Sequence, residues 1–166
     1  MKKLLLFFIV ISLLGCSAKN EQNNEILMID CPEVFFSSEN NIYIDGSSND
    51  TDLEDIGYKA SINNYRFEKS CFTNQKRNNY NLDLLIIVKP INPNDQDISL
   101  PLFVLFYDIE GKLIARQYYR IENDLAFDKD SSKYEITDIT ESLNIYLEAS
   151  QKVSYITVGF VNVINN

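Results

Sequence analysis

Residues 80–89 read YNLDLLIIVK, and this stretch decides the fold class that the sequence predicts. Apolar or aromatic side chains recur at every second position, which is typical of a β-strand with one face on a core. The core face should carry Tyr80, Leu82, Leu84, Ile86 and Val88. The polar residues of the opposite parity, which are Asn81, Asp83 and Lys89, should face outward.

Flanking stretches extend this pattern to seven or eight strands. Residues 100–108 and 113–121 are rich in apolar and aromatic side chains, and 109–112 (IEGK) predicts a tight hairpin turn because Gly111 can adopt φ > 0. No stretch longer than ten residues has a helical period. We therefore predict an all-β fold, a single antiparallel β-sandwich. The other expected strands lie within 26–36, 58–72, 134–139, 143–147 and 153–164, and a short strand at 42–44 could interrupt the loop-rich stretch 37–57.

In one of these strands the apolar positions change parity part-way along. Ala60 and Ile62 occupy one parity of 58–72, whereas Tyr65 and Phe67 occupy the other. A strand of period two can keep both sets on one face only if it contains one extra residue. The sequence therefore predicts a β-bulge at Asn63-Asn64.

The first residues of the chain predict export and anchoring. Lys2 and Lys3 precede an apolar run, 4–14, that is shorter than the roughly 20 residues needed to cross a membrane. The next residues complete Leu13-Leu14-Gly15-Cys16, which resembles the lipobox of bacterial lipoproteins. The resemblance implies removal of 1–15 as a signal peptide, lipid on Cys16 and, because Ser17 follows, the periplasmic face of the outer membrane. An ordinary cleaved signal or an uncleaved anchor is the alternative.

The remaining cysteines predict one disulfide. With Cys16 taken by lipid, Cys31 and Cys71 are left in an oxidising compartment and can pair in only one way. Two unpaired buried thiols are the alternative. Cys31 precedes Pro32, which has no backbone N–H, so the first strand should be an edge strand or contain a break.

Several short motifs accompany the lipobox, namely Cys31-Pro32, Tyr58-x-Ala60-x-Ile62, Cys71, Pro101-Leu102-Phe103-Val104 and Asp108-x-x-Gly111-Lys112-x-x-Ala115-Arg116. Together with the lipobox they resemble a known group of proteins. The group consists of small, uncharacterised alphaproteobacterial envelope lipoproteins with an immunoglobulin-like domain. The resemblance implies an immunoglobulin-like β-sandwich of seven to eight strands over 26–166, joined to the lipid by an acylated Cys and flexible tether, 16–25. It implies no catalytic residue.

Composition excludes several function classes. The chain has 166 residues, a formal net charge of −9 and no His. Acidity argues against nucleic acid as a partner, because phosphate binding needs clustered Lys and Arg. The absence of His removes the commonest general base and metal ligand, so we predict no catalytic residue, no cofactor and no metal site. An enzyme would have to rely on carboxylates, Tyr or Lys.

An acidic segment keeps one alternative open. Residues 45–55 contain Asp, Glu, Asn and Ser oxygens that could bind Ca²⁺, but Asp50 and Ile56 stand where an EF-hand needs Gly and Glu. We interpret the segment as a solvated loop, and we interpret the acidic stretch 122–130 in the same way. A small-ligand or Ca²⁺-binding lipoprotein is therefore the second hypothesis for function.

The first hypothesis is a non-catalytic interaction or scaffolding module. Arg116, Tyr118 and Arg120 share one parity of a predicted strand, and Tyr107 lies across the hairpin. Tyr and Arg are enriched in interface hot spots. We therefore expect these four residues to form an interface with another envelope protein, while lipid on Cys16 binds the membrane.

Overall fold

The computed structural model describes residues 26–46, 56–74 and 76–161. The expected signal peptide and the expected tether with Cys16 lie outside these residues. The described part of the chain is all-β, and no helix within it is long and apolar enough to cross a membrane. Its strands are β1 (Leu27–Met28), β2 (Glu33–Phe36), β3 (Ile42–Ile44), β4 (Tyr58–Phe67), β5 (Phe72–Thr73), β6 (Arg77–Pro90), β7 (Asp97–Tyr107), β8 (Leu113–Asp124), β9 (Phe127–Asp128), β10 (Lys133–Tyr134), β11 (Thr137–Glu148) and β12 (Tyr155–Phe160).

The first sheet is built around β6 and is antiparallel. β11 pairs with one edge of β6 over twelve residues, and β4 pairs with the other edge, followed by β3. β5 continues the line of β4 along β6 and pairs in turn with β1. The long central strand thus serves as the template on which the shorter segments align.

The second sheet has the order β2-β12-β7-β8. Its pairs are antiparallel except for β2, which runs parallel to β12. The β7–β8 hairpin turns at Gly111, where φ is +78°. The Asp108 carboxylate holds this turn by accepting hydrogen bonds from the backbone N–H groups of Glu110 and Lys112. The turn predicted at 109–112 is therefore confirmed.

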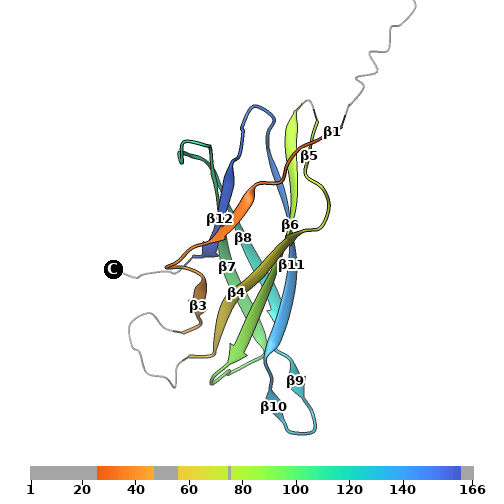
Figure 1. Cartoon of the computed structure of the whole chain (residues 1–166). Helices are drawn as coiled ribbons and strands as arrows, with labels where there is room; N and C mark the ends of the chain where they lie inside the picture. The colour runs from red at the N-terminus through yellow and green to blue at the C-terminus, as the bar shows by residue number, and fades with distance from the viewer. Residues whose placement is uncertain (1–25, 47–55, 75, 162–166) are drawn as a thin grey trace, which may run out of the picture.

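The core lies between the two sheets, which face each other in Figure 1. The alternation read in 80–89 is confirmed, because its five inward residues are at most 2% exposed. Their counterparts across the core come from β7 and β12. These are Ile98, Leu100, Leu102, Val104, Phe106, Ile156, Val158 and Phe160.

The strand count is higher than predicted, with twelve strands in the described part of the chain instead of seven or eight. Pro32 separates β1 from β2, so the first segment pairs with one sheet and then with the other. Residues 68–71 are not part of a strand and separate β4 from β5, although the Glu68 N–H still donates to the Asn81 carbonyl of β6. The expected acidic loop 122–132 contains the short strand β9, which forms a hairpin with β10 at one end of the molecule (Figure 1). The two expected strands 134–139 and 143–147 are largely one continuous strand, β11.

The predicted disulfide is present. Cys31 and Cys71 are bonded with their Cα atoms 5.2 Å apart. The bond lies where the first segment passes from β1 to β2 and where the chain passes from β4 to β5. It therefore joins two interruptions of the strand pattern.

Candidate functional site

The outward side of the second sheet gathers aromatic side chains from three strands. Tyr107 of β7 lies opposite Tyr155 of β12, and their rings stack with centroids 4.8 Å apart and planes 9° apart. Phe35 of β2 meets Tyr155 edge-on at 5.7 Å. Phe35 is 50% exposed even though it takes part in this cluster. Aromatic pairs in such geometries hold each other in place and leave ring surface for a partner.

Arginine and tyrosine side chains continue this surface on β8. Arg116, Tyr118 and Arg120 are exposed, and Tyr118 is 62% exposed. In the β7–β8 register Tyr118 lies opposite Phe103, and Arg116 lies opposite Leu105. Directly opposite residues of an antiparallel pair point to the same side of the sheet. We call Phe35, Tyr107, Tyr118, Tyr155, Arg116 and Arg120 together the aromatic face.

The structure thus brings the four predicted interface residues to one side of one sheet. Tyr107 stacks on Tyr155, whereas Tyr118 lies on the neighbouring hairpin strand. Neither Arg116 nor Arg120 forms an ion pair with another described residue. The two guanidinium groups are therefore available to a partner.

A glycine shapes the middle of the aromatic face. Gly159 of β12 lies opposite Phe103, and a Cβ atom at Gly159 would come within 2.5 Å of the tip of the Phe103 ring. The missing side chain leaves space in which the ring lies over the backbone of β12. Any larger residue at 159 would push Phe103 outward and change the contour of the surface.

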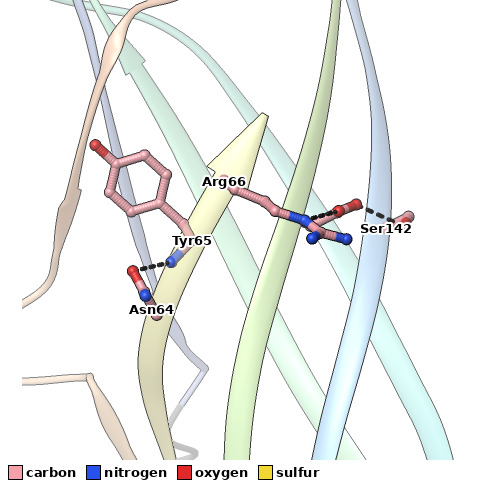
Figure 2. A network of polar contacts seen from close by, with 5 residues as sticks. Asn64, Tyr65, Arg66 and Ser142 are labelled. Carbon is pink, nitrogen blue, oxygen red and sulfur yellow. Dashed lines mark hydrogen bonds and ion pairs between the residues drawn. The ribbon is translucent and has the colours of Figure 1, made fainter. Parts of the chain in front are cut away.

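Polar contacts on the outward side of the first sheet form a second cluster. Arg66 of β4, Asp83 of β6 and Ser142 of β11 lie directly opposite one another across three strands. Arg66 Nε is 2.8 Å from Asp83 Oδ2, and Ser142 Oγ donates to Asp83 Oδ1 at 2.6 Å. Figure 2 shows Arg66 and Ser142 approaching this carboxylate from opposite sides. We call these three residues the polar rung.

Asp83 is buried, although its charge and parity predicted a solvent-facing side chain. It does point away from the core, but it is only 3% exposed, and side chains from both neighbouring strands bond to its carboxylate. Hydrogen bonds from Ser142 and Arg66 lower the pKa of the Asp83 carboxyl. A carboxylate held in its ionised form is a poor general base, so the polar rung is suited to holding strands together.

The predicted bulge creates the polar rung. The register of β4 against β6 shifts between Ile62 and Asn64, which confirms the extra residue expected at Asn63-Asn64. Beyond the shift, Tyr65 lies opposite the inward residue Leu84. Arg66 is therefore turned to the outward side, where it meets Asp83. Without the extra residue the parity would be reversed.

Other candidate sites have less support in the structure. Residues 47–55 of the acidic loop lie outside the described residues, while Asp45 lies at its base, where burial and the charge of Asp95 raise the pKa of its carboxyl. Within the described ranges no group of three or more Cys, Asp or Glu side chains is placed to hold a metal ion. A hollow of about 260 Å³ lies beside Arg66 and Asp83 and is open to solvent.

Comparison of the chain with protein-family models, with curated proteins and with solved structures finds no match. Inferences about function therefore rest on the residues and their geometry.

Proposed function

We propose that the chain is a lipid-anchored module of the bacterial envelope that binds another envelope protein through the aromatic face. The observation that carries this proposal is the joint exposure, on one outward sheet surface, of Phe35, Tyr118 and two arginines that form no ion pair with a described residue. Tyr and Arg contribute large contact area and directional hydrogen bonds, and they are the residue types enriched at interface hot spots. The two arginines place positive charge on this surface of an otherwise acidic chain. They therefore favour a partner with acidic side chains at the contact.

We also propose an immunoglobulin-like arrangement of the two sheets. The connection from β6 to β7 passes from the first sheet to the second, and the connection from β11 to β12 does so again. The β6–β11 and β7–β12 pairs are thus joined in the manner of a Greek key. β2 lies parallel to β12 at the position where a final strand would otherwise extend the second sheet.

The anchoring part of the proposal rests on the lipobox-like residues Leu13-Leu14-Gly15-Cys16. They support lipid on Cys16 and a position on the periplasmic face of the outer membrane. Cys16→Ala should move the chain from the membrane fraction to the soluble periplasmic fraction. Retention of the variant in the membrane would contradict lipid anchoring through Cys16.

Crosslinking of a tagged full chain in living cells tests the binding surface. Wild type should yield one reproducible envelope protein, and Arg116→Glu with Tyr118→Ala should lose it. The matched control is Lys89→Glu with Tyr146→Ala on the outward side of the first sheet, where Tyr146 is 50% exposed. The control should retain the partner, and a purified sample of that partner should bind wild type directly. Equal capture by all three proteins would overturn the assignment of the aromatic face.

A further inference from the structure

β8 is a long edge strand, twelve residues in length, at one side of the second sheet. Its neighbour β7 reveals which backbone groups of β8 are unpaired. The carbonyl groups of Pro101 and Tyr107 accept hydrogen bonds from Val161 and Ser154, on the side of β7 that faces β12. N–H and C=O groups of one residue point to the same side of an antiparallel strand, so odd-numbered residues of β7 face β12 and even-numbered residues face β8.

The register then assigns the free edge of β8. Leu102 and Val104 face β8 and lie opposite Tyr119 and Gln117, which therefore form the ladder. The alternate residues direct their N–H and C=O groups away from β7. At the two ends of β8 such groups are bonded, because the Gln151 side chain donates to the Ile114 carbonyl and the Asp124 N–H donates to the Asn123 side chain. Between these ends, no hydrogen bond within the described chain involves the outward backbone groups of four residues. These four residues are Arg116, Tyr118, Arg120 and Glu122.

The side chains of these four residues are complementary to the same four side chains of a second copy of β8 that runs in the opposite direction. If a second copy of β8 pairs antiparallel about Tyr119, Arg116 lies opposite Glu122 of the second copy. Tyr118 then lies opposite Arg120 of the second copy, and the symmetry repeats both contacts. Opposite charges and Arg–aromatic contacts between directly opposite residues stabilise such a pair, and the free backbone groups complete the ladder.

The other long edge strand lacks this property. On β11 the outward backbone groups belong to the even-numbered residues, and the Gln117 side chain donates to the carbonyl of Tyr146. Pairing of β11 with itself about Leu143 would place Asp138 opposite Glu148 of the second copy, where the charges repel. Acidic residues thus protect β11 in the way that charged side chains commonly protect sheet edges.

We propose that two copies of this chain associate through the free edges of β8, antiparallel about Tyr119, to form one continuous sheet from their second sheets. The side chains of the aromatic face remain on the outward side of the joined sheet, where those of Arg116, Tyr118 and Arg120 also contact the second copy. The association therefore goes beyond the proposed binding of an envelope protein and does not require it.

Charge reversal on the purified full chain tests this pairing without any other protein present. The mass of the protein would be measured by sedimentation equilibrium in density-matched detergent. Arg116→Glu and Glu122→Arg should each raise the dimer dissociation constant about tenfold, because each places like charges opposite one another twice. The two changes together should restore wild-type association. Residues 116 and 122 are six positions apart on one extended strand, so restoration can arise only between copies.

The outcomes separate this inference from the proposed function. A monomeric wild type, single variants that associate as wild type does, or a double variant that fails to recover would each overturn the β8 pairing. None of these results depends on capture of an envelope partner. Arg116→Glu occurs in both tests, so loss of partner capture by the aromatic-face variant does not bear on the β8 pairing, which the recovery of the charge-swapped double variant decides.

Discussion

Asp83 illustrates how a single charged residue can be stabilised outside a core. Its carboxylate accepts hydrogen bonds from Ser142 and Arg66, while the Arg66 side chain stays 72% exposed. One partner of the ion pair is therefore exposed to solvent and the other is buried. The hydrogen bonds to Asp83 stabilise the fold more than the Coulomb attraction to Arg66 does. The polar rung ties β4, β6 and β11 together on the side away from the core.

Arg66→Gln should lower the free energy of unfolding by about 1–2 kcal/mol at neutral pH, since it removes a charge-assisted hydrogen bond from a buried carboxylate. The folded-state pKa of Asp83 is lowered, so its contribution is present above the usual Asp pKa of about 3.9 and is lost as the pH falls through the lowered pKa. The difference between wild type and variant should therefore shrink below about pH 4. Urea denaturation at several pH values measures it.

Lys89→Gln is the matched control, because Lys89 is exposed on the same outward side of β6 and has no ion pair with a described residue. It should change the free energy of unfolding by less than about 0.5 kcal/mol. A loss for Arg66→Gln that stays constant from neutral pH to pH 3 would contradict the role given to Asp83.

Residue patterns in the sequence predict parity well and contacts between distant strands poorly. Arg116, Tyr118 and Arg120 could be assigned to one face because they are neighbours on a single strand. Phe35 and Tyr155 could not be added to them, because Tyr155 joins through the pairing of β12 with β7 and Phe35 through the parallel pairing of β2 with β12. The burial of Asp83 depends in the same way on the register of three strands.

At the scale of the element, the bulge in β4 decides which side chains face the core. It lets Ile62 and Phe67 both face inward although their parities differ, and it turns Arg66 outward. The bulge also turns Tyr65 inward, where its ring contacts Phe36 of the second sheet edge-on with ring centroids 6.0 Å apart. This element could be predicted from the sequence, since the change of parity was visible in the apolar positions alone.

Deletion of Asn63 should lower the free energy of unfolding by about 3–5 kcal/mol. The shortened strand would turn Arg66 toward the core and leave Asp83 buried without its cation. Thermal and urea unfolding of the deletion variant measure the loss. Deletion of Asn94, in the connection between β6 and β7, is the control. It should lower the free energy of unfolding by less, because connections tolerate changes in length. Equal losses would show that the bulge has no special role.

The breaks that divide the strands were harder to foresee. Pro32 indicated one interruption, but nothing in residues 68–71 indicates that the chain leaves the ladder there. The reason becomes clear only in the fold, where β1 and the disulfide occupy the place next to β5. The strand propensity of a local stretch does not indicate which strand from a distant part of the chain will lie beside it.

At the scale of the whole molecule, the first described segment belongs to both sheets. β1 pairs with β5 of the first sheet, and β2 pairs with β12 of the second. Both strands are short, so their backbone hydrogen bonds alone hold the segment weakly. The Cys31–Cys71 bond fixes the crossing point between them.

Replacement of both cysteines, Cys31→Ala with Cys71→Ala, should lower the free energy of unfolding by about 4 kcal/mol in the chain-entropy model for a closed loop of this size. Guanidinium denaturation measures the loss. Wild type under reducing conditions should lose a similar amount, which separates the bond itself from the effect of the new side chains. A loss below about 1 kcal/mol for both samples would contradict the prediction.

The same disulfide determines how the molecule would carry a mechanical load applied from its N-terminal side. A pulling force that reaches Cys31 passes through the covalent bond to Cys71, which is 40 positions further along the chain, and enters the first sheet at β5. β2, β3 and β4 lie within the closed loop and are spared the tension. Reduction of the bond would open this path and lengthen the fully stretched chain by about 140 Å. If the domain were pulled by its N-terminal end, only the pairing of β1 with β5 could separate before the covalent Cys31–Cys71 bond carried the force.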